Sequence, residues 1–133
     1  MKRELTNEEA LKILEGLTKF RDSDIEIPIE VGYRIIQNIK SLKDALEPYE
    51  EARIQTIQKY SDDGESVEPK SKNYKFCRRD INTLLRIAID VDVNEIAWSA
   101  IKNIKAPMNC VNALMFMTEK PSGDAQEEIN PNE

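Results

Sequence analysis

Residues 87–95 read Ile87-Ala-Ile-Asp-Val-Asp-Val-Asn-Glu95, and within them apolar side chains alternate with polar ones. This period of two is typical of a strand with one buried face. The other stretch of this kind is Ile25-Glu-Ile-Pro-Ile29. Since the remaining chain has helical patterns, each stretch has few partners except the other. We therefore predict a minimal two-stranded ribbon that pairs Ile25–Ile29 with Ile89–Val93.

The segment before Ile25 predicts an amphipathic helix. Thr6 can cap its N-terminus, and Glu9 completes a capping box three residues later. The apolar residues that follow share one helical face: Ala10, Ile13, Leu14, Leu17 and Phe20.

A longer helix is predicted for about residues 29–60, which at roughly 1.5 Å per residue would span nearly 50 Å. Pro48 is expected to kink it or to start a new segment, because the proline ring clashes with the carbonyl one turn back. Apolar residues repeat along it with the spacing of a coiled coil: Ile35, Ile39, Leu42, Leu46 and Tyr49. This row predicts self-association into a homodimer. If the chain is a monomer, the row instead packs on the first helix.

The second half of the chain predicts a polar loop at 61–72 and a third helix over about 73–87. Asn94 is expected to cap a further helix, and residues 110–117 form a last one. The predicted fold is therefore mainly α, with a helical hairpin, additional helices and the two-stranded ribbon. We expect one helical domain at residues 1–117. Residues 118–133 carry five acidic and one basic residue and are expected to form a disordered acidic tail.

The composition argues against several function classes. The chain of 133 residues has no histidine, only four glycines and a net charge of −6, and it has no catalytic, nucleotide-binding or cofactor motif. Asp90-Val-Asp-Val-Asn94 resembles the start of a calcium loop, but Glu95 replaces the required glycine. We expect Cys77 and Cys110 to be buried, reduced thiols. With no membrane span and no signal peptide, the protein is expected in the cytoplasm. Because it has no catalytic motif, it is not expected to be an enzyme.

Basic residues gather in and before the third helix, with Tyr74 and Phe76 between them. They are the candidate partner-binding residues: Lys70, Lys72, Lys75, Arg78, Arg79 and Arg86. Basic side chains interleaved with aromatics can contact nucleic acid, but the overall acidity favours a solvated face, which could equally meet an acidic protein surface. Trp98, Met108 and residues 115–117 form a late cluster, which is expected in the core or, if exposed, at an interface.

Several features in this order match a known pattern. They are an amphipathic helix, Ile27-Pro-Ile29, a long helix containing Pro48-Tyr-Glu-Glu-Ala-Arg53 and Gln58-Lys-Tyr60, an acidic loop with one glycine, Phe76, Ile81-Asn-Thr-Leu-Leu85 and Ile89-Asp-Val-Asp-Val-Asn-Glu-Ile96. Over residues 5–96 the chain thus resembles a family of small proteins of unknown function from tailed phages of Gram-positive bacteria. Residues from Ala97 onward depart from the short family members. The resemblance implies a phage or prophage origin and expression in the host cytoplasm, and it carries over no catalytic residues.

These observations predict a non-enzymatic protein that binds another protein in an infected cell. One version is a stoichiometric inhibitor of a bacterial defence complex, of the anti-CRISPR type. A second version is a virion or tail assembly factor that associates with structural phage proteins. The alternative from a different class is a nucleic-acid-binding regulator that uses residues 70–79.

Overall fold

The computed structural model describes residues 1–118 of the chain, and it confirms a mainly α fold with a two-stranded antiparallel ribbon. The elements in chain order are β1 (Lys2–Thr6), α1 (Asn7–Arg21), α2 (Ile29–Tyr60), α3 (Tyr74–Leu85), β2 (Ala88–Asp92), α4 (Trp98–Ile101) and α5 (Met108–Met117). None of the described helices is both long and apolar enough to cross a membrane.

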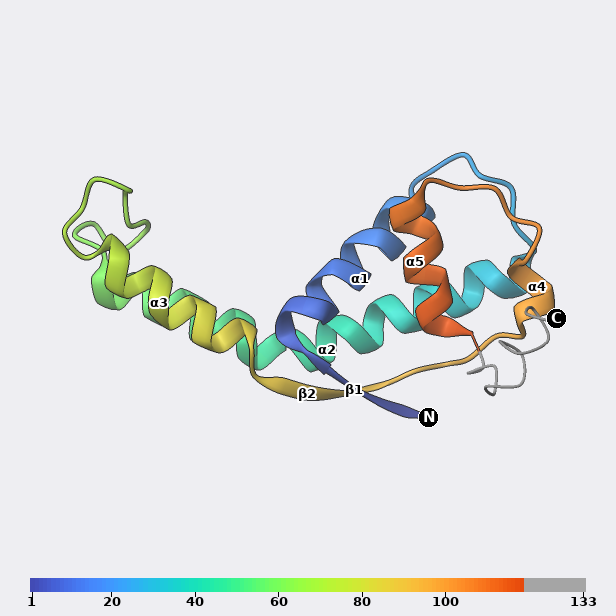
Figure 1. Cartoon of the computed structure of the whole chain (residues 1–133), viewed down its shortest axis with the longest axis horizontal. Coiled ribbons are helices and arrows are strands. Elements are labelled where there is room, and N and C mark those ends of the chain that lie inside the picture. The colour runs from blue at the N-terminus through green and yellow to red at the C-terminus, as the bar shows by residue number, and fades with distance from the viewer. Residues whose placement is uncertain (119–133) are drawn as a thin grey trace, which may run out of the picture.

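α2 is the spine of the molecule and runs along its whole length (Figure 1). α1 and α5 lie over its N-terminal half, and α3 folds back along its C-terminal half. We call residues 47–86 the arm and the remaining described residues the body. Pro48 lies inside α2, which continues through it as one helix, so the predicted alternative of a new segment is wrong.

The first helix has the predicted start. The Thr6 hydroxyl accepts a hydrogen bond from the backbone N–H of Glu9, and the Glu9 carboxylate accepts one from the N–H of Thr6. This reciprocal capping box is confirmed. Because Thr6 is also the last residue of β1, the cap fixes the corner between the ribbon and α1.

The ribbon exists, but its predicted pairing is wrong. β2 pairs with the N-terminal strand β1, in a register that places Arg3 opposite Val91 and Leu5 opposite Ile89. Residues 25–28 form no strand and lead into α2, whose first N–H groups bond to the carbonyl of Pro28. Proline has no N–H to donate to a ladder. In contrast, the segment Lys2–Thr6 can offer all of its backbone groups.

The predicted self-association row is buried within one chain. Its members are 0–7% exposed and belong to the hydrophobic core: Ile35, Ile39, Leu42, Leu46 and Tyr49. These side chains are therefore not available to a second copy of the folded chain, because the elements on the inner side of α2 already cover them. The alternative of packing within a monomer describes this row correctly.

The C-terminal part is less helical than expected. Asn94 caps no helix; its backbone bonds instead to the side chain of Asn38 on α2. α4 is a single turn that follows Ala97. α5 crosses α1 closely at Gly16, where an added Cβ would lie 2.8 Å from the Ala113 Cβ and from the Asn109 carbonyl oxygen. Thr118 is buried and pairs with Ile96, so the folded part includes it. The rest of the predicted acidic tail lies outside the described residues.

Candidate functional site

α3 is held on α2 by apolar packing and by polar contacts at the end of the arm. The Tyr60 hydroxyl donates a hydrogen bond of 2.8 Å to the Asp80 carboxylate. The Asn73 amide donates to the carbonyl of Tyr60. Cys77 is buried against α2 as a free thiol, and burial raises the pKa of that thiol. These contacts fix which side of α3 faces α2 and leave the opposite side in solvent.

A shallow groove of about 440 Å³ runs along the solvent side of α3. It is lined by Tyr74, Lys75, Arg78, Arg79, Asn82, Thr83 and Arg86. Four of these seven residues are cationic and none is acidic. Spacings of three and four residues place them on one side of a helix. We call these four cations, Lys75, Arg78, Arg79 and Arg86, the basic face.

The charges of the basic face are mostly available to a ligand. Among the described residues, Arg79 is the member with an ion pair, a 3.4 Å contact to the neighbouring Asp80. Its guanidinium also lies 5.3 Å from the centre of the Phe76 ring. The hydrogen bond from Tyr60 holds the pKa of Asp80 below its usual value. Asp80 therefore remains an anion at neutral pH and orients Arg79 at one edge of the groove.

The loop before α3 brings acidic groups to the end of the arm. The Asp63 carboxylate accepts hydrogen bonds from the Ser61 hydroxyl and from the N–H groups of Glu65 and Ser66. These bonds lower the pKa of Asp63 to about 2. The basic face is therefore limited at this end by a loop that carries its own negative charge.

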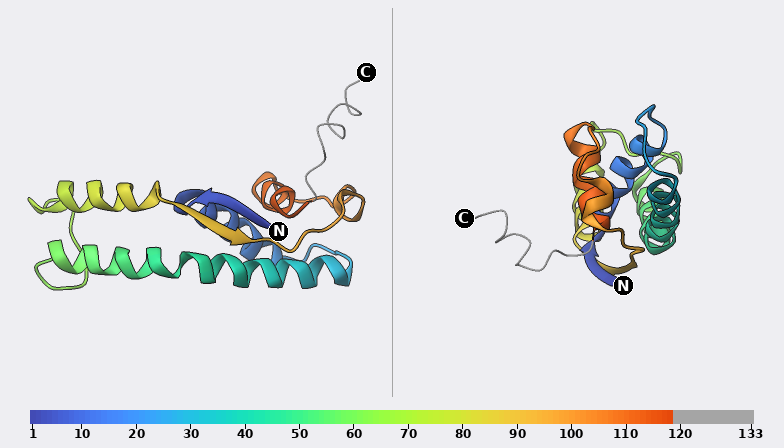
Figure 2. Two further views of the ribbon diagram at one scale, coloured as in Figure 1. Left: turned by 90° about the horizontal axis from the view of Figure 1, so that it is seen from below. Right: turned by 90° about the vertical axis from the view of Figure 1, so that its right-hand side faces the viewer.

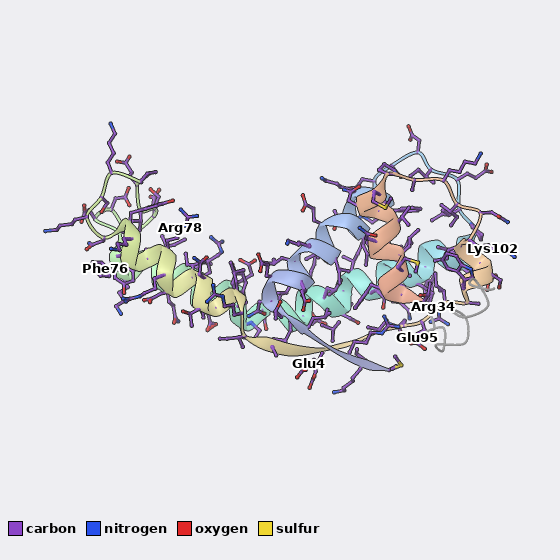
Figure 3. All side chains as sticks on the ribbon, in the orientation of Figure 1. Glu4, Arg34, Phe76, Arg78, Glu95 and Lys102 are labelled. Atoms are coloured by element: carbon purple, nitrogen blue, oxygen red, sulfur yellow. The ribbon has the colours of Figure 1, made fainter. Side chains whose placement is uncertain are left out.

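The structure brings together four of the six predicted partner-binding residues. Lys70 and Lys72 lie in the exposed loop before α3 and do not line the groove. The uncharged residues Tyr74, Asn82 and Thr83 complete the groove. Asn82 and Thr83 follow Arg79 by three and four residues, so helical spacing could have added both to the predicted site. Phe76 and Arg78 lie on the arm, at the opposite end of the molecule from Lys102 (Figure 3).

Two further sequence candidates, the stretch that resembles a calcium loop and the late cluster, lie on other elements than α3. Asp90 and Asp92 lie on β2, and among the described residues no group of three or more acidic, Cys or His side chains could hold a metal ion. The late cluster is divided. Phe116 and Met117 are buried, whereas Trp98, Met108 and Met115 are exposed. These exposed side chains are spread over α4 and α5.

Comparisons with protein-family models, curated proteins and solved structures find no match to this chain. We therefore infer what the site can bind from its own side chains. A helix surface with four cations and three uncharged side chains that can form hydrogen bonds can bind an extended anionic surface through several weak, additive contacts.

Proposed function

We propose that this chain is a non-enzymatic protein that binds an acidic surface of another protein through the basic face of α3. The observation that supports this proposal most directly is the charge of the groove. All of its charged lining residues are basic, on a chain with a net charge of −6. Charges of one sign on a protruding element steer a partner of the opposite sign and fix its orientation. α3 also lies on the arm, at the opposite end of the molecule from α4 (Figure 1), where a large partner can reach it.

An acidic protein suits this face better than nucleic acid does. Binding to single strands relies on exposed aromatic rings that stack on bases. Here Tyr74 is half-buried. The Phe76 ring is 44% exposed, but the Arg79 guanidinium lies 5.3 Å from its centre and competes with a base for that ring. The acidic loop at the end of α3 would repel a phosphate backbone that continued past it. An acidic helix or loop, in contrast, can end within the length of α3, which is about 17 Å.

The setting of this interaction follows from the sequence resemblance. A phage or prophage protein in the host cytoplasm would meet host defence complexes and phage structural proteins. Our preferred version is a stoichiometric inhibitor that occludes an acidic surface of a defence complex. The second version is a virion or tail assembly factor. The two versions differ in the partner but share the same binding face.

The test is a pull-down of tagged protein from a lysate of its bacterial host, with and without phage infection, followed by mass spectrometry. Arg78→Glu/Arg86→Glu should lose a partner that the unchanged protein retains. Lys12→Glu/Lys105→Glu, which makes the same change in net charge on the body, should keep it. A host defence subunit from uninfected cells supports the inhibitor version, and phage structural proteins alone support the assembly version. Equal recovery by both variants would overturn the role of α3.

The nucleic-acid alternative needs its own measurement. If the basic face binds DNA or RNA, a gel shift should appear at low salt, weaken steeply as salt rises, and disappear in Arg78→Ala/Arg79→Ala. We expect no shift. Nuclease treatment of the lysate before the pull-down should likewise leave recovery of the protein partner unchanged.

A further inference from the structure

The outer face of α2 carries a regular row of exposed side chains. α2 lies along one side of the molecule, and the other elements lie on its opposite side (Figure 2). The row on the open side has spacings of four and three residues, as on one face of a helix. Its members are Ile36, Lys40, Lys43, Glu47, Glu50 and Ile54. The two isoleucines at its ends are 56% and 47% exposed.

The order of this row is self-complementary when the helix is reversed. It reads apolar, basic, basic, acidic, acidic, apolar. An antiparallel second copy, centred at the level of Ala45, places Lys43 opposite Glu47 and Lys40 opposite Glu50. The same register places Ile36 opposite Ile54. Each of these pairs occurs twice, because the two-fold axis repeats every contact.

Two other arrangements of the same two helices are unfavourable. A parallel pair in register would place each lysine opposite the same lysine of the second copy. An antiparallel pair shifted by seven residues would align Ile29 with Ile54, but it would also bring Lys40 opposite Lys43 and Ile36 opposite Glu47. Like charges in direct opposition disfavour a register. Among arrangements with a two-fold axis, the row therefore favours one direction and one register.

The contacts within one chain leave these charges free to exchange partners. Among the described residues, Lys43 and Glu47 have no ion pair. Their order along the helix, lysine before glutamate, is also the weaker one for a pair within a helix. Lys40 contacts Asp44 at 3.3 Å and Glu50 contacts Arg53 at 3.2 Å. Exposed pairs such as these contribute little and are readily replaced.

We propose that the outer face of α2 binds the same face of a second copy, antiparallel, about a two-fold axis at the level of Ala45. The contact extends over about 27 Å of helix. It is apolar only at its ends, so it belongs with the small, transient interfaces. Because its central pairs are exposed, salt should weaken it. The two arms then point to opposite ends of the dimer, and both basic faces remain accessible.

The test is sedimentation velocity over a range of protein and salt concentrations. The unchanged protein should show a concentration-dependent dimer at low salt that dissociates at high salt. Lys43→Glu should raise the dissociation constant about tenfold or more, because it replaces two attractive pairs with two repulsive ones. Glu47→Lys should do the same. The double variant Lys43→Glu/Glu47→Lys should restore the dimer, since each facing pair is again of opposite charge.

A matched control separates this contact from general charge repulsion. Lys105→Glu makes the same change in net charge as Lys43→Glu but lies in the loop between α4 and α5, so it should leave the dimer intact. The exposed positions of all these substitutions should preserve the helical circular dichroism spectrum. A monomer at every concentration in low salt, or a dimer that Lys43→Glu does not weaken, would overturn the proposal. So would failure of the charge-swapped double variant to recover the dimer.

Discussion

The side chain of Asn38, in the N-terminal half of α2, binds both backbone polar groups of Asn94, two residues after the end of β2. Its Oδ1 accepts the N–H of Asn94 at 2.7 Å, and its Nδ2 donates to the Asn94 carbonyl oxygen at 2.9 Å. Asn38 is 1% exposed. Buried backbone groups need partners, and here one amide supplies both. The contact joins the ribbon to the spine of the molecule at the point where the chain leaves β2.

Asn38→Ala should therefore cost about 2–4 kcal/mol of the free energy of unfolding, because it removes two hydrogen bonds and leaves buried backbone groups unpaired. Chemical denaturation followed by circular dichroism measures this loss. The control Asn82→Ala removes an exposed amide from α3 and should stay within about 0.5 kcal/mol of the unchanged protein. Equal stability of the two variants would show that Asn94 finds other partners.

Two helical glycines should respond in opposite directions to alanine. Gly16 lets α5 approach α1, and an added Cβ there would lie 2.8 Å from two heavy atoms of α5. Gly16→Ala should therefore destabilise the fold by about 1–3 kcal/mol through overpacking. At Gly32 the added Cβ would make one ordinary contact of 3.6 Å, with Ile27. Gly32→Ala should stabilise the fold by up to about 1 kcal/mol, because alanine favours helix. Thermal unfolding of both variants tests the contrast, and a shift of the same sign in both would contradict it.

The helices were predictable because their signals are local. The capping box at Thr6 and the apolar row of α2 each depend on residues one or two turns apart, and both helices are confirmed. The ribbon partner was not predictable in this way. Leu5 is the one apolar residue of β1, so the strand has no hydrophobic alternation. Its pairing with β2 depends on backbone hydrogen bonds and on the corner at Thr6.

The site was predictable only where it follows helical spacing. Lys75, Arg78, Arg79 and Arg86 share a face because α3 is a regular helix. Lys70 lies in a loop whose path follows no short-range rule. The role of Asn38 was missed for a different reason. It is a polar residue between Ile35 and Leu42 on the buried face of α2, and this exception to the pattern was the available signal.

The apolar row of α2 should stabilise the fold of one chain and should not mediate self-association. Leu42 is fully buried in the core, so Leu42→Ala should cost about 2–5 kcal/mol of the free energy of unfolding. The neighbouring Lys43 is exposed, and Lys43→Ala should change this free energy by less than about 0.5 kcal/mol when measured at low protein concentration. Urea denaturation compares the two. If Leu42→Ala abolished the dimer without lowering stability, the buried row of α2, and not its outer face, would mediate self-association.

The contact between Tyr60 and Asp80 should make the end of the arm sensitive to acid. The hydrogen bond from the Tyr60 hydroxyl lowers the folded-state pKa of Asp80 below 3.8. A lowered carboxyl pKa stabilises the fold above the unfolded-state pKa, and this contribution is lost as the pH falls through the lowered value. Tyr60→Phe should therefore raise the pKa of Asp80 toward 3.8 and reduce the acid-dependent loss of stability below about pH 4. Carboxyl carbon NMR titration measures the shift directly. Asp63, held by the Ser61 hydroxyl and not by Tyr60, should keep its pKa of about 2 in the same variant. An unchanged Asp80 titration would mean that Arg79, the neighbouring cation, sets the pKa instead.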